Sequence, residues 1–322
     1  MQRAETIQPR KPSETQAQAV NQLVVNWHIT EACNYSCRYC YSSWKKKRAG
    51  RELFRDGKAT RELLRELFRF FSPDNTTNPL HARLKWADLR LSVAGGEPLL
   101  YPETTTQIAH EAKALGFKLS LITNGSMLTN CNLDSLFKNL SMLGISLDSA
   151  DAQTCHQIRR ADKSGQVLNF DTLVKAVETA RSVNPGILIK VNTVVNKFNA
   201  KENLTELVER INPDKWKILK VLSVINDELA ISEQQFESFV NRHQKLGSAL
   251  SAENNQDMTE SYLMVDPHGR FFQNQSNIRA GKPYDYSRPI LQVGAEAAFR
   301  QINFDVMKFL GRYSMFPVEV AV

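Results

Sequence analysis

The sequence predicts an α/β fold of the barrel type, in which helices cover a parallel sheet. From residue 23 onward, short apolar segments rich in β-branched residues alternate with segments of helical periodicity, which is typical of βαβ units. Six such units follow one another along the chain. A chain of 322 residues can bury a full α/β barrel core. We therefore expect one large domain with extensions.

The predicted strands are apolar enough to be buried on both faces, as in parallel sheets. They cover residues 23–29, 89–93, 118–123, 142–147, 188–195 and 217–221. The predicted helices between them cover residues 60–71, 104–115, 132–140, 171–183 and 201–211. Pro102 and Asp171 stand where helix start signals belong.

The ends of the chain are expected to differ from this repeat. Residues 1–22 are polar and read as a flexible tail without the apolar core of a secretion signal. After the barrel, assigned to residues 23–250, a last helix is predicted over residues 232–250 from the start signals Ser232 and Glu233. The segment SYLMVDPHGRFF predicts a hairpin within a C-terminal extension, residues 251–322, that closes the barrel and shapes the ligand pocket.

Composition narrows the class of protein. The net charge of +7 and the pI near 9.1 favour an anionic partner, either nucleic acid or a phosphorylated small molecule. The basic run KKKR at residues 45–48 is equally compatible with a solvated face. No apolar run is long enough to span a membrane. Five cysteines, three of them close together, indicate a reducing cytoplasm rather than a disulfide framework.

The segment ITEACNYSCRYCY places Cys33, Cys37 and Cys40 in a CxxxCxxC pattern directly after the first predicted strand. This spacing suits three ligands of one 4Fe-4S cluster and leaves the fourth iron without a protein ligand. That iron can chelate the amino and carboxylate groups of S-adenosylmethionine (SAM), whose reductive cleavage yields a 5'-deoxyadenosyl radical. A structural zinc site is the alternative, but Cys131 and Cys155 are isolated and read as ordinary thiols.

Three lysines fall on two predicted neighbouring strands. Alternate residues of a strand share a face, so Lys215 and Lys217 should point together beside Lys190, with Trp216 buried between them. Several cations at a barrel mouth can neutralise a triphosphate. The alternative is that these lysines are exposed charges at the barrel rim.

Together these motifs resemble the radical SAM superfamily, whose fold is a partial (β/α)6 barrel. The resemblance implies that the GGE segment after the second strand (Gly95, Gly96, Glu97) and Tyr39 of the cysteine loop bind SAM. It implies the same for Asn124 in ITNGS, for Ser146 and Asp148 in ISLDS, and for Arg160. Turn and cap chemistry is the alternative explanation for such Gly, Asn, Ser and Asp residues.

From Val24 to about Arg312, the chain resembles the viperin family more closely, particularly its prokaryotic members. The blocks that carry this resemblance are NWHITEACNYSCRYCY, LSVAGGEP, ITNGS, ISLDS, KVNTVVNKFNAKENLTE, INPDKWKILK and ESYLMVDPHGRF. The resemblance implies conversion of a nucleoside triphosphate to its 3'-deoxy-3',4'-didehydro analogue, a chain terminator used in antiviral defence. In this reaction the ribose 4' hydrogen would be abstracted and the 3' hydroxyl would then be lost.

The viperin resemblance also implies roles for individual residues. Asn192 and Val194 share the face of Lys190 and are expected near the adenine of SAM, and Tyr262 beside the nucleobase. The expected triphosphate ligands are Arg90, Lys190, Lys215, Lys217 and Arg312.

Partners are expected from the same comparison. An electron donor such as flavodoxin or ferredoxin would reduce the cluster. Membrane attachment is not expected, because the amphipathic helix of animal viperins is absent. The chain ends MFPVEVAV rather than with the C-terminal tryptophan that animal viperins use in cluster delivery, so the resemblance names no maturation partner. Two alternatives stay open. One is a radical SAM enzyme acting on a peptide or another small molecule, although no cysteine follows Cys155 to bind further clusters. The other is a basic nucleic-acid-binding protein, although no nucleic-acid-binding motif is present.

Overall fold

The computed structural model describes residues 17–41, 51–129, 132–222, 227–279 and 282–312. Ten strands form one sheet in the order β10-β9-β8-β1-β2-β3-β4-β5-β6-β7. Their bounds are β1 Gln18–His28, β2 Leu84–Ala94, β3 Lys118–Thr123, β4 Met142–Ser146, β5 Leu188–Val195, β6 Lys215–Lys220, β7 Leu250–Glu253, β8 Leu263–Val265, β9 Arg270–Arg279 and β10 Lys282–Pro289.

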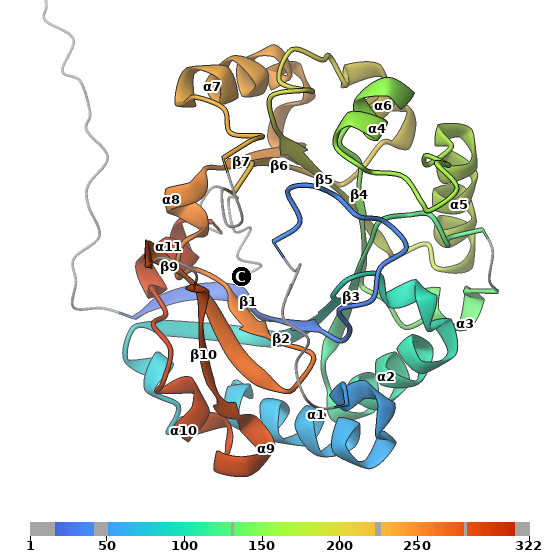
Figure 1. Cartoon of the computed structure of the whole chain (residues 1–322). Coiled ribbons are helices and arrows are strands. Elements are labelled where there is room, and N and C mark those ends of the chain that lie inside the picture. Colours follow the sequence, from blue (N-terminus) through green and yellow to red (C-terminus); the bar gives the residue numbers. More distant parts are fainter. Residues whose placement is uncertain (1–16, 42–50, 130–131, 223–226, 280–281, 313–322) are drawn as a thin grey trace, which may run out of the picture.

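Strands β1 to β7 are parallel and curve into a partial barrel with the helices outside (Figure 1). Within the described residues, no backbone pairing joins β7 to the opposite edge of the sheet. On the side of β1 away from β2, β8 pairs with β1 in parallel, and β9 and β10 continue the sheet in antiparallel order to the opposite edge. A side-chain contact does connect β7 with the segment before β8, because Tyr262 donates a hydrogen bond to Glu253 at the end of β7.

The larger helices form where capping residues and an apolar face coincide. Asp56 caps α1 by accepting hydrogen bonds from the backbone of Lys58 and Ala59, and the helix buries Leu63, Leu64 and Leu67 against the sheet. The helices are α1 Gly57–Phe71, α2 Pro102–Leu115, α3 Asp134–Phe137, α4 Ala152–Gln157, α5 Phe170–Val183, α6 Thr205–Ile211, α7 Glu233–Arg242, α8 Asn255–Met258, α9 Ile290–Val293, α10 Ala295–Phe299 and α11 Val306–Gly311. None of the described helices is both long and apolar enough to cross a membrane.

All six predicted strands are confirmed, and the bounds predicted for β3 and β5 are unchanged in the structure. The predicted start of β1 was wrong: the strand begins at Gln18, so residues 18–22 are strand rather than tail. Residues 18–20 are held there by pairing with residues 84–86 of β2, a contact that the mostly polar composition of residues 1–22 does not reveal.

The predicted helix over residues 232–250 is correct only in its first half. Ser232 and Gln235 form a capping box and α7 begins as expected, but it ends at Arg242. A 3-10 helix follows over Gln244–Ala249, and Leu250 already belongs to β7. Gly247 adopts a φ of 63°, which interrupts regular helix.

The hairpin predicted from SYLMVDPHGRFF is confirmed by the antiparallel pairing of β8 with β9, whereas β10 was not predicted. The boundary proposed at residue 250 stays a prediction, and β7 spans it. Several sequence features lie outside the described residues. They are residues 1–16, the KKKR run, Cys131 and the terminal segment MFPVEVAV.

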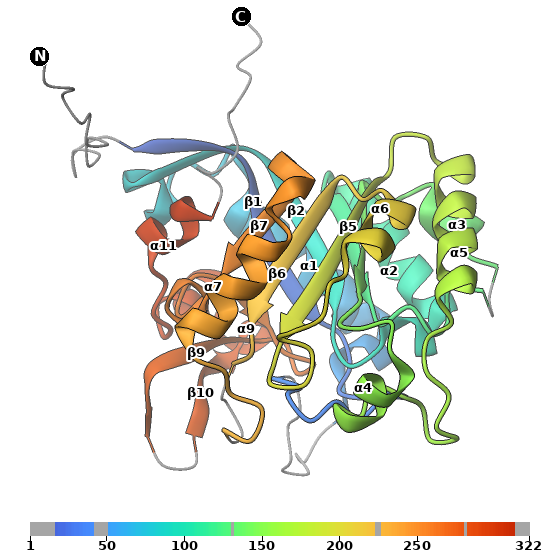
Figure 2. The ribbon, with the colours of Figure 1, turned by 90° about the horizontal axis from the view of Figure 1, so that it is seen from above.

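The loop that carries the three cysteines follows β1 and lies at the carboxyl ends of the parallel strands (Figure 2). Polar residues gather at this end of parallel sheets because the strand-to-helix loops meet there. The carboxylate of Glu52 holds the start of this loop by accepting hydrogen bonds from the Thr30 hydroxyl at 3.1 Å and from the Glu31 backbone N–H at 2.7 Å.

Candidate active site

A cavity of about 340 Å³ runs through the interior of the barrel. It is lined by all the residues predicted to bind the cluster, SAM, the triphosphate or the nucleobase, with the exception of Glu97. These lining residues are Cys33, Cys37, Tyr39, Cys40, Arg90, Gly95, Gly96, Asn124, Ser146, Asp148, Arg160, Lys190, Asn192, Val194, Lys215, Lys217, Tyr262 and Arg312. The fold therefore brings residues from every part of the barrel to one site.

The three cysteine thiols are half-buried and line the same end of this cavity. The amide of Asn124 donates a hydrogen bond to Cys33 Sγ at 3.7 Å, which links the cysteine loop to the end of β3. Among the described residues, no three His, Cys, Asp or Glu side chains converge on a position for a single metal ion. A cubane does not require such convergence, because each thiolate binds a different iron. The three thiols therefore fit a 4Fe-4S cluster.

Gly95 and Gly96 are needed where β2 ends against the cysteine loop. The backbone N–H of Gly96 donates to the carbonyl of Thr30 at 2.7 Å. A Cβ at Gly96 would lie 2.0 Å from the Ala32 carbonyl oxygen, and Gly95 has a φ of +147°. Only glycine permits this close approach. The motif thus positions the cysteine loop, whatever further contact it makes with a ligand.

Glu97 is fully buried and lies behind the cavity wall. Its carboxylate accepts hydrogen bonds from the backbone N–H of Leu99 at 2.9 Å and of Asn124 at 2.7 Å, and from the Thr123 hydroxyl at 2.8 Å. Burial raises the pKa of Glu97, and these hydrogen bonds oppose that rise. In this structure Glu97 ties the end of β2 to the end of β3, and a direct contact with SAM stays a prediction.

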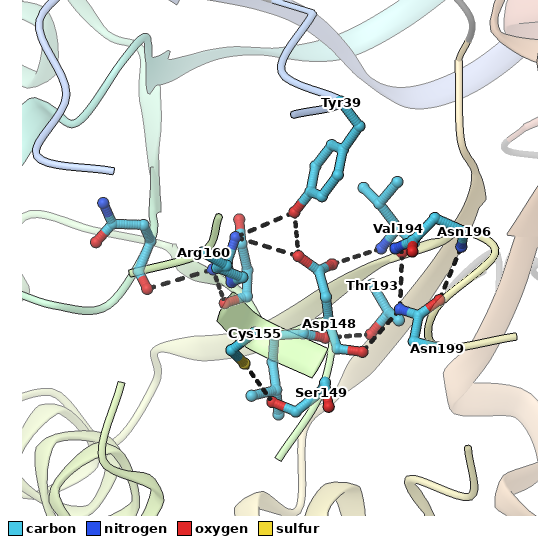
Figure 3. A network of polar contacts seen from close by, with 12 residues as sticks. Tyr39, Asp148, Ser149, Cys155, Arg160, Thr193, Val194, Asn196 and Asn199 are labelled. Carbon is cyan, nitrogen blue, oxygen red and sulfur yellow. Dashed lines mark hydrogen bonds and ion pairs between the residues drawn. The ribbon is translucent and has the colours of Figure 1, made fainter. Parts of the chain in front are cut away.

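Tyr39 of the cysteine loop forms a polar network with Asp148 and Arg160, both of which are buried (Figure 3). Asp148 accepts a hydrogen bond from the Tyr39 hydroxyl and pairs with Arg160 at 3.2 Å. Arg160 also donates to the backbone carbonyls of Ser146 and Asn124. The network joins the cysteine loop to the ends of β3 and β4.

The same aspartate fixes the end of β5. The backbone N–H of Val194 donates to the Asp148 carboxylate at 2.7 Å, and the Asn199 amide donates to the Asp148 carbonyl at 2.8 Å. Asn192 lies two residues before Val194 on β5, opposite Ser146 of β4. Asp148 therefore organises the predicted adenine-binding edge.

The five cationic side chains predicted to bind the triphosphate line the other part of the cavity: Arg90, Lys190, Lys215, Lys217 and Arg312. Lys220 lines it as well and pairs with Glu233 at 2.5 Å. In the β5–β6 register, Lys190 lies opposite Lys215 and Asn192 opposite Lys217. Lys215 and Lys217 share a face, as predicted, and Trp216 between them is fully buried. Lys217 is buried, Lys190 and Lys215 are half-buried, and all three line the cavity, which counts against the alternative of exposed rim charges.

Glu253 was not predicted as a site residue. It lies at the end of β7 with a relative exposure of 5%, and its carboxylate pairs with Lys217 and, at 3.0 Å, with Arg312. Tyr262 donates to the same carboxylate, accepts from Lys217 at 3.0 Å and carries Arg312 over its ring at 3.5 Å. No sequence signal marks Glu253, because its position depends on the pairing of β7 with β6.

The charges in this cluster shift one another's pKa values. Burial, together with the charges of Lys217 and Arg90, lowers the pKa of Lys190 well below its usual range. Burial lowers the pKa of Lys217 to about 8, although Glu253 opposes the shift. Burial alone would raise the pKa of Glu253, but Lys217 and Arg312 lower it to about 2. Without an anionic ligand, the site thus holds more positive charge than it can easily retain.

Comparisons with known proteins agree with this site. A family profile described as the Radical SAM superfamily matches residues 27–211. Among solved structures, anSMEcpe with bound AdoMet has a TM-score of 0.59 at 14% identity, covering 92% of this chain and 84% of that one. Streptococcus suis SuiB bound to S-adenosylmethionine has a TM-score of 0.56 at 13% identity, covering 91% of this chain and 68% of that one. At these identities the likeness concerns the fold alone.

Two curated relatives are similar over almost their whole length. A protein of Psychrobacter lutiphocae named S-adenosylmethionine-dependent nucleotide dehydratase is 42% identical over 295 residues, which is 92% of this chain and 96% of that protein. A protein of Pseudoalteromonas ulvae with the same name is 39% identical over 304 residues, or 94% of this chain and 97% of that protein.

The fold, the three thiols and the family match define a radical SAM enzyme, a class that uses a 4Fe-4S cluster and SAM. Within this class, the chain belongs to the family of S-adenosylmethionine-dependent nucleotide dehydratases, the viperin family.

Proposed function

We propose that this chain dehydrates a nucleoside triphosphate to its 3'-deoxy-3',4'-didehydro analogue. The observation that carries the proposal is that one cavity holds three thiols at one end and, along the rest, the five cationic side chains predicted to bind a triphosphate. A triphosphate needs several cations, and a radical reaction needs the cluster and the substrate in one enclosed space. The two relatives named nucleotide dehydratases support the same reaction class.

In this proposal Cys33, Cys37 and Cys40 hold the cluster. The neighbouring ligands of SAM are Tyr39, Gly95, Gly96, Glu97, Asn124, Ser146, Asp148, Arg160, Asn192 and Val194. With the cluster and SAM bound, the site supplies a radical that removes one hydrogen atom from the substrate. The buried Asp148–Arg160 pair keeps the cysteine loop in register with the strand ends.

The substrate loses the hydrogen of ribose C4', and the C3'–O bond then breaks. Hydroxide leaves and takes up a proton, so that one water is lost overall, and a second electron completes the C3'–C4' double bond. The chain holds the reacting atoms close together and excludes bulk water.

The cationic residues place the ribose by holding the triphosphate tail. Arg90, Lys190, Lys215 and Lys217 project from β2, β5 and β6, and Arg312 reaches in from the end of α11. Tyr262, held between Lys217 and Arg312, presents its ring to the nucleobase. In the same proposal, a flavodoxin or ferredoxin of the cytoplasm supplies the electrons. The product acts in antiviral defence. Neither a membrane nor a nucleic acid takes part in the reaction.

The test is an anaerobic incubation of the reduced, cluster-loaded protein with SAM and each of the four ribonucleoside triphosphates. We expect 5'-deoxyadenosine and, from at least one nucleotide, a product lighter by one water in mass spectrometry. The Cys37→Ala variant should lose the brown colour of the cluster and form neither product. 5'-Deoxyadenosine without any dehydrated nucleotide would overturn the proposal and favour a peptide or another small molecule as substrate.

A further inference from the structure

Arg90, Lys190, Lys215, Lys217 and Arg312 form a cationic cluster in the cavity. The balance of charge around this cluster indicates whether the nucleotide binds with or without a metal ion. Among the described residues, the only carboxylates that line the cavity are Asp148 and Glu253. Asp148 lies beside Arg160, whose charge offsets its own. Glu253 lies among the five cationic side chains predicted to bind the triphosphate. Lys220 also lines the cavity, but Glu233 offsets its charge at 2.5 Å. The part of the cavity assigned to the triphosphate therefore carries about four net positive charges when its lysines are protonated.

Neither carboxylate is arranged to hold a metal ion. Glu253 is already bonded to Lys217, Arg312 and Tyr262. Asp148 is bonded to Arg160, to Tyr39 and to the backbone N–H of Val194. Protein-bound Mg²⁺ usually takes one or two carboxylates together with substrate phosphates and several waters. A metal ion on the phosphates would find no such partner among the described side chains.

A nucleoside triphosphate tail carries roughly four negative charges near neutral pH, because its terminal phosphate contributes about two of them. The cationic cluster balances that charge without a metal ion. A nucleotide with bound Mg²⁺ carries about two fewer negative charges and would leave excess positive charge buried in the cavity. That excess is costly here, since burial already lowers the pKa of Lys190 and of Lys217.

We propose that the site takes its nucleoside triphosphate in the metal-free form, with Arg90, Lys190, Lys215, Lys217 and Arg312 in the place that Mg²⁺ occupies on other nucleotide enzymes. This inference rests on the proposed function and deepens it, because it specifies the charge state of the substrate.

The experiment measures the affinity of the cluster-loaded, SAM-bound protein for CTP, UTP, GTP and ATP in turn by anaerobic titration calorimetry. Each titration is run in metal-free buffer and again with Mg²⁺ in excess. We expect the Kd for total nucleotide to rise about tenfold or more when Mg²⁺ is added, because Mg²⁺ binds the nucleotide and lowers the concentration of its metal-free form. Product formation should fall in parallel.

Variants that change the charge of the cluster make the test sharper. Lys190→Met removes one positive charge and should reduce the ratio of Kd with Mg²⁺ to Kd without it. Glu253→Gln removes the negative charge and should increase that ratio. Lys201→Met, a change of an exposed lysine, is the matched control and should leave the ratio unchanged.

Binding that requires Mg²⁺, or that Mg²⁺ leaves unaltered, would overturn this inference and leave the proposed function standing. If none of the four nucleotides binds at any Mg²⁺ concentration, the proposed function falls and this inference falls with it.

Discussion

Lys190 of β5 lies directly opposite Lys215 of β6, so two ammonium groups are paired across the parallel sheet and face the same cavity. Like charges in this position are unfavourable in the empty protein and favourable once an anion lies between them. The pair of lysines therefore lowers the stability of the empty protein and favours the binding of an anionic ligand.

Replacing Lys190 with methionine should separate these two effects. Without nucleotide, Lys190→Met should raise the free energy of unfolding by about 1 kcal/mol, because a buried cation beside Lys217 and Arg90 is removed. Its Kd for the nucleotide should rise about tenfold or more. Urea denaturation and titration calorimetry measure the two quantities. A variant that is less stable and binds as well as the unmodified chain would contradict this assignment.

Glu253→Gln should have the opposite effect on stability. The change leaves Lys217 and Arg312 buried without their shared carboxylate, which should lower the free energy of unfolding by about 3 kcal/mol. A bound triphosphate replaces the lost negative charge, so nucleotide should raise the Tm of the variant by more than it raises that of the unmodified chain. Thermal unfolding with and without nucleotide tests this, and equal shifts in Tm would count against it.

Nucleotide binding should take up protons near pH 8. The pKa of Lys217 is about 8 in the empty site, and a bound triphosphate raises it by favouring the charged form. Affinity should therefore fall as the pH rises from 7.5 to 9.5. Calorimetry in buffers of different ionisation enthalpy measures the proton uptake. Lys217→Arg, which keeps its charge over this range, should reduce the uptake, and an unchanged uptake would refute the role of Lys217.

His28 should make the fold sensitive to acid. It is buried between Tyr41 and Phe272, and burial lowers its pKa from 6.5 to about 4. The folded state therefore binds a proton less readily than the unfolded state, and stability falls as the pH drops below 6.5. Between pH 7 and pH 5 the loss should be about 2 kcal/mol.

Urea denaturation across this pH range is the measurement. His28→Phe keeps an aromatic ring against Tyr41 and Phe272 and should flatten the dependence on pH. His110→Gln, a change of an exposed histidine, should leave the dependence as it is. Identical pH profiles for all three proteins would show that another group is responsible.

Gly96→Ala should prevent the cysteine loop from closing over β2. Its Cβ would lie 2.0 Å from the carbonyl oxygen of Ala32, which is backbone and cannot move aside alone. We expect a folded protein that holds little iron after cluster reconstitution, measured by iron content and visible absorbance. Gly57→Ala, whose Cβ meets nothing closer than 3.6 Å, is the control and should hold a full cluster. Full iron loading of Gly96→Ala would disprove this role.

The sequence by itself determined those features whose signals are local. The CxxxCxxC spacing is contained in one loop, so Cys33, Cys37 and Cys40 could be identified without knowing what surrounds them. The central strands are continuous apolar runs, and alternation along β6 placed Lys215 and Lys217 on one face. The family resemblance supplied Arg90, Arg312 and Tyr262, which no local pattern marks.

Only the tertiary structure decided the features that join distant segments. Glu253 becomes a site residue because β7 pairs with β6 and carries its carboxylate to Lys217. Glu97 is placed behind the cavity wall by hydrogen bonds from the end of β3. The start of β1 at Gln18 is held by β2. Pairing register and burial arise from the folded chain as a whole, so the charge balance of the cavity could not be read from the order of residues.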